Sequence, residues 1–251
     1  MKRAAPSFFL LFACLSLSSY SAHAETATST KSSADPAVVF EQLRSYVASN
    51  PLDFKTTYVV QGELSSRGSM QFFVQRPNSF RIDSKVGNRS YEIISDGKVM
   101  TIFTPKDKKY AQLDAPAHPS GGLSLVTGLM GVESAVLGLL DVVDDIAAGK
   151  KDLQISSGGS ETIGGNQCDE FTIVQNTDTG ANTWKVWLRK GETPLPCKLE
   201  TKGSDESLIT QSNEFSWNVP SPEFPPDKFA FTPAAGSQKV DVGDLDLGPA
   251  L

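Results

Sequence analysis

Cysteine and histidine are the side chains most able to do covalent or acid-base chemistry, and this chain has few of them. Beyond residue 24 they are Cys168, Cys197 and His118, the last within the Pro-rich stretch APAHPS. A serine nucleophile needs a base beside it, and no G-x-S-x-G turn marks such a serine. The spacing of these three residues also matches no zinc pattern. They predict neither a catalytic centre nor a metal centre.

Acidic clusters are the second feature that could do chemistry. DVVDD at Asp141 to Asp145 and DVGDLD at Asp241 to Asp246 could collect a cation, but neither has the alternating ligands of a calcium loop. A carboxylate pair for glycoside hydrolysis can be chosen in many ways from 29 acidic residues, which gives that reaction no specific support. SSGGSETIGG lacks the lysine and following helix of a phosphate loop. We therefore predict a protein that is not an enzyme and has no metal or cofactor.

The two cysteines raise a geometric question. If CDEFTIV, TWKVWLRK and CKLETK form an antiparallel meander, Cys168 and Cys197 lie on opposite sides of the middle strand. Two strand spacings are about 9.6 Å, beyond the limit of roughly 7 Å on the Cα separation of a disulfide. A bridge therefore requires one cysteine at a frayed or twisted strand end. We expect a Cys168–Cys197 disulfide on that condition, and two buried free thiols are the alternative.

The start of the chain has the pattern of a secretory signal peptide. Lys2 and Arg3 precede the apolar run FFLLFACLSLSSY, and the small residues Ala22 and Ala24 predict cleavage after Ala24. A membrane anchor is the alternative, but the run is short and a polar segment follows it. A lipoprotein signal ending at Cys14 is disfavoured because much of the apolar run lies after that cysteine. We expect an exported protein.

The net charge of the exported chain disfavours some classes of binding partner. Removal of Lys2 and Arg3 from the 23 Lys and Arg residues leaves 21 against 29 Asp and Glu, a formal net charge of about −8. Nucleic acids and anionic membrane surfaces are bound by basic patches, so neither is an expected partner. Beyond the leader no segment reaches the roughly 20 apolar residues of a membrane span.

The sequence predicts one helix and two series of strands, which must position the candidate site residues. After a Ser/Thr-rich tether at 25–34, Asp35 and Pro36 begin an amphipathic helix that ends at Asn50-Pro51. Its apolar side is expected to carry Val39, Leu43, Tyr46 and Val47. The strands follow as FKTTYVVQGEL, SMQFFVQR, SFRIDSKV, RSYEIISD, KVMTIFT and KYAQLD, then as DLQIS, ETIGG, QCDEFTIV, TWKVWLRK, PCKLETK and SLITQSNEFSW. Brief turns such as Asp96-Gly97 make neighbouring strands antiparallel.

Between the two series lies an apolar, glycine-rich insert. From Ser134 its Leu, Val and Ile residues recur at three and four, as in a helix, and the whole insert is expected to form a helical lid at about 122–148. A sheet of about 11 strands curls on itself, and its concave face is the dry place for such a lid. The expected fold is α+β: a strongly curved antiparallel sheet lidded by helices. It forms one domain at 35–242, with a frayed tail at 243–251.

Alternation along the strands predicts which side chains line the concave face. The expected hydrophobic cavity comprises Tyr58, Val60, Phe72, Val74, Phe80, Ile82, Tyr91, Ile93, Met100, Ile102, Trp184 and Val186 from the strands, with Leu125, Leu129, Met130, Leu137 and Leu140 from the lid. Plain core is the alternative for each of them, because alternation predicts burial and not an open cavity. A register error of one residue would exchange the two faces and place Trp187 inside instead.

Four further stretches carry a family resemblance. RPNSFRID at Arg76 to Asp83, SDGKVMTIFTPKDKKYAQLDAP at Ser95 to Pro116, TWKVWLRKGETPLPCKLE at Thr183 to Glu200 and FAFTPAAG at Phe229 to Gly236 resemble a family of uncharacterised predicted periplasmic proteins. That family is placed within the LolA/LolB-like superfamily of lipoprotein carriers. The resemblance covers about Asp35 to Val242.

The resemblance implies a half-open barrel and a periplasmic, non-enzymatic carrier or chaperone for an acyl chain, lipid or lipoprotein. The alternative is an envelope protein-interaction or sensor module on the same scaffold, with the cavity filled by its own helices. Its partner would then be an envelope protein.

Overall fold

The structure is a computed structural model that describes residues 34–61, 65–75, 78–115, 143, 146, 153–177, 180–202, 210–220 and 222–247. The expected signal peptide, most of the tether and His118 lie outside these residues, as does the expected lid except for Val143 and Ile146. Val143 is buried in the main core, and Ile146 packs against that core.

Helix α1 (Pro36–Ser49) begins where the sequence predicted. The Asp35 side chain accepts a hydrogen bond of 2.9 Å from the backbone N–H of Ala37, which satisfies one of the free donors at the helix start. Phe40, Leu43 and Val47 are buried. They recur at three and four along the chain and so form one stripe on the helix.

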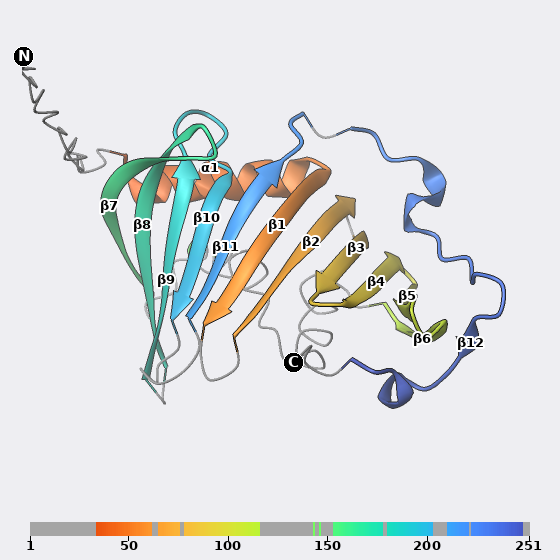
Figure 1. The fold of residues 1–251 in the computed structure, drawn as a ribbon. Helices are drawn as coiled ribbons and strands as arrows, with labels where there is room; N and C mark the ends of the chain where they lie inside the picture. The colour runs from red at the N-terminus through yellow and green to blue at the C-terminus, as the bar shows by residue number, and fades with distance from the viewer. Residues whose placement is uncertain are drawn as a thin grey trace, which may run out of the picture.

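One sheet of twelve strands makes up most of the structure (Figure 1). The strands are β1 (Leu52–Gln61), β2 (Ser66–Gln75), β3 (Ser79–Val86), β4 (Arg89–Asp96), β5 (Val99–Thr104), β6 (Lys109–Asp114), β7 (Leu153–Ile163), β8 (Asn166–Thr177), β9 (Gly180–Arg189), β10 (Pro196–Lys202), β11 (Thr210–Trp217) and β12 (Gln238–Lys239). Their order is β12-β6-β5-β4-β3-β2-β1-β11-β10-β9-β8-β7, antiparallel except for the short β12–β6 pair. The sheet is curved and unclosed, as expected, with β12 and β7 at its two edges.

The pairing of β1 with β11 joins two meanders into this single sheet. Strands β1 to β6 pair in chain order and so do β7 to β11, whereas β1 and β11 are brought together from opposite ends of the described domain. Helix α1 lies across the half of the sheet that runs from β7 to β1 (Figure 1). We call the face that α1 covers the inner face and the opposite one the outer face.

The C-terminal segment packs first on the outer face. Phe224 contacts Phe73 of β2 with ring centroids 5.9 Å apart, and Phe231 contacts Phe103 of β5 at 5.5 Å. The short helix η1 (Pro226–Phe229) between them contacts β3 and β4. This segment buries apolar side chains such as Ile94 and Phe103, which would otherwise face solvent.

The same segment then turns around the edge of the sheet. Strand β12 pairs with β6, the helix η2 (Val242–Asp244) follows, and Leu245 and Leu247 are buried in the inner-face core. Asp246 forms an ion pair of 3.0 Å with Arg89 of β4. The expectation of a frayed tail from residue 243 is therefore wrong for residues 243–247. Two leucines two residues apart supply enough apolar surface to hold the segment, despite its acidic composition.

The Asp96-Gly97 turn between β4 and β5 is held by its own aspartate. Asp96 Oδ1 accepts bonds of 2.8 Å from the backbone N–H groups of Val99 and of Lys98, and Gly97 takes a φ of 90°. These bonds, that from Val99 first, lower the pKa of Asp96 below its ordinary value.

We expect Asp96→Ala to lower the free energy of unfolding by about 1 kcal/mol at neutral pH, because two backbone donors lose their charged acceptor. A lowered folded-state pKa means that this contribution is present above the unfolded pKa and is lost as pH falls through the folded one. The wild-type advantage should therefore disappear in urea unfolding series run from pH 7 towards strong acid. Asp107→Ala, in the next turn, is the control, and an Asp96→Ala deficit that persists in acid would contradict this account.

Candidate functional site

The inner face carries the candidate site. All twelve strand residues predicted to line the cavity lie on this face and belong to one core cluster. Ten are buried, namely Tyr58, Phe72, Val74, Phe80, Ile82, Tyr91, Ile93, Met100, Ile102 and Val186, while Val60 and Trp184 are partly buried. The five predicted lid residues, Leu125, Leu129, Met130, Leu137 and Leu140, lie outside the described residues. The structure thus places the predicted strand residues together, and it does not test whether they bind a ligand.

The register of the strands explains how these side chains meet. Phe54 of β1 pairs with Phe72 of β2, and the same row continues through Ile82, Ile93 and Ile102. Residues directly opposite one another on neighbouring strands have Cβ atoms about 5 Å apart. The row is therefore a continuous apolar surface that crosses five strands.

Aromatic rings extend that surface towards the other half of the sheet. The Phe54 ring stacks on Phe72 at 4.7 Å between centroids and on Trp217 of β11 at 4.4 Å. Farther along, Phe40 of α1 meets Phe171 of β8 edge to face at 5.5 Å. Stacked and edge-to-face pairs stabilise beyond the area they bury. Phe40, Phe54 and Phe171 were absent from the predicted lining, although the alternation around Tyr58 and Ile173 would have indicated the last two.

Trp187 lies on the outer face, apart from the residues predicted to line the cavity. It packs with Cys168 and Cys197 in a small separate cluster, and Lys198 Nζ sits 4.6 Å from the centre of its ring. The Trp184 side chain, three residues earlier, packs against the inner-face core instead.

Cys168 and Cys197 form the expected disulfide, with Cα atoms 6.7 Å apart. The ladder between β9 and β10 pairs Pro196 with Leu188 and then Lys198 with Trp187, so Cys197 sits in an irregularity of the register. A bulge bends its strand and so shortens the distance that two regular strand spacings would impose. This is the strand-end distortion that the bridge required, and the alternative of two free thiols is wrong.

A cavity of about 640 Å³ opens beside the start of α1. Phe171 and Leu188 from the inner-face core line it together with Val38 and Val39 of the helix. Asp169 on its rim is buried, accepts a hydrogen bond from Ser160 and pairs with Lys190 at 3.2 Å. The cavity is therefore lined by apolar core side chains on one side and by polar side chains, including the Asp169–Lys190 ion pair, at its rim.

Several polar side chains interrupt the inner face, and sequence reasoning missed them. Thr56, Ser84, Gln211 and Asn213 are each at most 3 % exposed. The signal was available, because Thr56 lies between the inward-facing Phe54 and Tyr58, and Ser84 lies between Ile82 and Val86. Small polar residues at inward positions were passed over because the prediction followed apolar residues alone.

Potential metal ligands are a further feature of the described part of the chain. No group of three or more His, Cys, Asp or Glu side chains there could hold a metal ion. The DVVDD cluster cannot be placed because Asp141, Asp144 and Asp145 lie outside the described residues, and Asp246 of the other acidic cluster pairs with Arg89.

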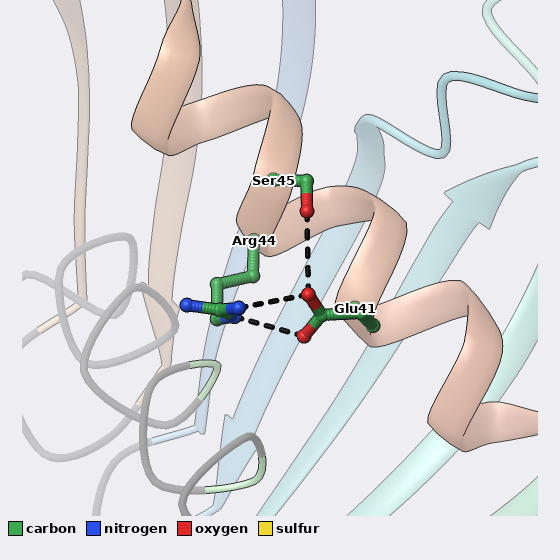
Figure 2. A network of polar contacts seen from close by, with 3 residues as sticks. All are labelled: Glu41, Arg44 and Ser45. Atoms are coloured by element: carbon green, nitrogen blue, oxygen red, sulfur yellow. Dashed lines mark hydrogen bonds and ion pairs between the residues drawn. The ribbon is translucent and has the colours of Figure 1, made fainter.

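The charged network on α1 is an exposed one (Figure 2). Arg44 donates two hydrogen bonds of 2.9 and 2.8 Å to the Glu41 carboxylate, and Ser45 donates a third at 3.3 Å. The bonds from Arg44 lower the pKa of Glu41 from its ordinary value. The pair is one turn apart on the solvent side of the helix, where such contacts contribute little to stability. Both side chains of the pair are substantially exposed on the helix surface.

Solved structures of other proteins resemble this chain at low sequence identity. None of the curated proteins compared with this chain matches it. An uncharacterised conserved protein from Thermus thermophilus has a TM-score of 0.46 at 11% identity, with 81% of this chain and 96% of that chain covered. A LolA superfamily protein from Nitrosomonas europaea has a TM-score of 0.37 at 9% identity, with 77% and 96% covered.

The MucA/MucB complex of Pseudomonas aeruginosa has a TM-score of 0.45 at 14% identity, and the match covers 76% of this chain and 59% of that chain. Among the described residues no helix is both long and apolar enough to cross a membrane. The sequence matches the family described as "Predicted periplasmic protein (DUF2092)" over residues 36–243. Because that match spans most of the chain, the protein belongs to this family of predicted periplasmic proteins.

Proposed function

We propose that this protein is a periplasmic carrier or chaperone, without enzymatic activity, that holds the apolar part of a lipid, acyl chain or lipoprotein against the inner face of its sheet. The observation that supports this most is the continuous apolar row from Trp217 through Phe54 to Ile102. The periplasmic family assignment agrees with it, and export through a signal peptide cleaved after Ala24 forms part of the proposal.

Such binding does not require a group of charged side chains, because burial of the acyl chain can supply the free energy. Burial of each methylene is worth about 0.8 kcal/mol, so an acyl chain of about 16 carbons represents roughly 12 kcal/mol before ordering costs. An apolar surface can therefore hold its cargo with few polar contacts. The cavity beside α1, lined by Phe171 and Leu188, is a route by which a chain would reach the core of the inner face.

A second candidate is an envelope protein-interaction or sensor module that fills its own interior. One observation favours it: Phe80 and Ile102 are fully buried within the protein itself, as expected where the protein fills its own interior. A module of this kind would crosslink to a partner protein in cells and would carry no lipid.

The first test is native mass spectrometry of the protein purified from the periplasm without detergent, followed by organic extraction. The carrier proposal expects one lipid class at near-stoichiometric occupancy. A ligand-free mass that does not shift when fatty acid or phospholipid is added would overturn it and leave the interaction module.

Tryptophan quenching tests whether a bound chain reaches the inner face. The chain has three tryptophans, of which Trp184 lies on the inner face and Trp187 on the outer one. A variant that keeps only Trp184 (W187F, W217F) should lose most of its fluorescence when an acyl chain brominated near its middle is added, because bromine quenches at contact.

The matched control keeps only Trp187 (W184F, W217F) and should keep its fluorescence. Equal quenching of the two variants would mean that the chain adheres nonspecifically and does not enter the site.

A further inference from the structure

On strands β1 to β4 the inner face changes along the strands from mainly apolar to mixed apolar and polar. The row that begins at Leu52 of β1 and the row that begins at Phe54 are formed mainly by apolar side chains. The next row begins at Thr56 and reaches Ser84 through Met70, and the row after it begins at Tyr58. Since successive inward residues on a strand are about 7 Å apart, the change from apolar to polar occurs within one step along the strands.

Four polar atoms at this end find no hydrogen-bond partner among the described residues. They are Thr56 Oγ1, Tyr58 Oη, Ser84 Oγ and Asn213 Nδ2, and we call them the polar cluster. Each residue is at most 2 % exposed. Buried polar groups in proteins are nearly always paired, because an unpaired one loses its hydration without compensation. Four such atoms on neighbouring strands are therefore unusual for a purely structural core.

The cluster is held in position from both sides. Asn213 pairs directly with Tyr58 across the β1–β11 ladder, and Gln211 Nε2 donates to Asn213 Oδ1 at 3.2 Å. That bond orients the amide so that its Nδ2 donor is left over.

On the other side Tyr58 extends over Gly68 of β2, where an added Cβ would come within 2.5 Å of the phenol oxygen. Glycine at this position thus leaves space for the phenol to cross β2 towards β3, where Val86 pairs with Gly68.

The chemistry of the cluster is that of neutral donors. The amide nitrogen of Asn213 can only donate, and the three hydroxyls can donate or accept. Burial, with a smaller contribution from Tyr91, raises the pKa of Tyr58 to about 12, so its phenol keeps its proton at physiological pH. Arg89, the nearest cation along the Tyr58 row, is ion-paired with Asp246. A bare anion would find no unpaired cation there among the described side chains, whereas a carbonyl oxygen would find several donors.

We propose that the polar cluster binds the ester or amide carbonyl of an acylated ligand, with the acyl chain lying along the apolar rows beside it. This inference rests on the proposed carrier function and adds to it the class of cargo and its direction on the sheet. The linkage is held at the Thr56 to Tyr58 end, and the chain runs towards Phe54 and Leu52.

The test uses two probes that differ in the carbonyl. Methyl laurate and tridecane are compared for displacement of the hydrocarbon dye diphenylhexatriene from the protein purified without detergent. The measured quantity is the ratio of the two displacement constants, because that ratio cancels effects common to all apolar ligands.

Tyr58→Phe and Ser84→Ala each remove one oxygen of the cluster. Each should lower the ester-to-alkane ratio by about threefold to tenfold. Tyr110→Phe removes the same phenol oxygen from the outer face, where Tyr110 packs on Phe231, and is the matched control with an unchanged ratio. Both cluster variants should fold, with melting temperatures equal to or above that of the wild type.

Three outcomes separate the two proposals. A ratio that falls in Tyr58→Phe and Ser84→Ala but not in Tyr110→Phe supports the carbonyl site. A ratio unchanged in both cluster variants overturns it, leaves the carrier function intact and assigns the cluster to bound water. Failure of the dye and of both probes to bind the wild type overturns the carrier function and this inference with it.

Discussion

Phe40→Ala is expected to lower the free energy of unfolding by about 3 to 5 kcal/mol, the cost usual for truncating a fully buried phenylalanine. Phe40 is 1% exposed and packs its ring edge to face on Phe171, 5.5 Å away, which is the main aromatic contact between α1 and the sheet. Its removal leaves a hole between the helix and β8 that two rigid elements cannot close. Urea unfolding followed by circular dichroism measures the change.

The control lies on the same helix. Val38 is 53% exposed, and Val38→Ala should change stability by no more than about 0.5 kcal/mol. Hydrogen exchange adds a local readout, because in Phe40→Ala the amides of α1 should lose protection before those of β1 and β2. Equal effects of the two substitutions would mean that α1 is not anchored through Phe40.

Replacement of both Cys168 and Cys197 by alanine is expected to cost about 3.5 kcal/mol, because the bridge closes a loop whose ends are 29 residues apart in the sequence. The loss acts mainly through the unfolded chain, which gains the conformational freedom that the bridge removes. A second contribution comes from the outer-face cluster, where the bridge packs against Trp187. Thermal unfolding of the wild type and of the double variant, with and without a thiol reductant, measures both.

The thiol reductant provides a control for the thermal unfolding experiment, because it breaks the disulfide of the wild type without any substitution. It should lower the melting temperature of the wild type towards that of the double variant and leave the variant itself unchanged. A wild type that is insensitive to reductant even when unfolded would contradict the assigned bridge. Ligand binding on the inner face should survive in the double variant below its melting temperature, since the cysteines lie on the opposite face.

Helix α1 and the C-terminal segment limit access of a ligand to the inner face. Helix α1 covers one half of the sheet, and Leu245 and Leu247 of the C-terminal segment pack into the core of the same face. A carrier must admit and release its cargo past such elements. The cavity of about 640 Å³ lies at the start of α1, at the border of this covering.

Local pattern determined a large part of this protein from the sequence alone. Alternation along each strand depends on neighbours two residues apart, so the inward positions of Phe72, Ile82 and Ile102 could be predicted without knowing how the strands are ordered. The same holds for the helix start at Asp35 and Pro36 and for the Asp96-Gly97 turn, whose chemistry is contained in a few consecutive residues. Strand parity and the antiparallel pairing of consecutive strands followed from these short-range rules.

Tertiary structure alone decided the features that depend on distant segments. The pairing of β1 with β11, the bulge that brings Cys197 to Cys168, and the return of Leu245 to the inner face all join residues far apart in the sequence. A single sequence carries no local signal for such pairings, because many registers of similar strands bury similar apolar area. The polar cluster is also a feature that only the tertiary structure decided. Thr56, Ser84 and Asn213 are ordinary residues in their own strands and become a candidate site only when three strands place them together.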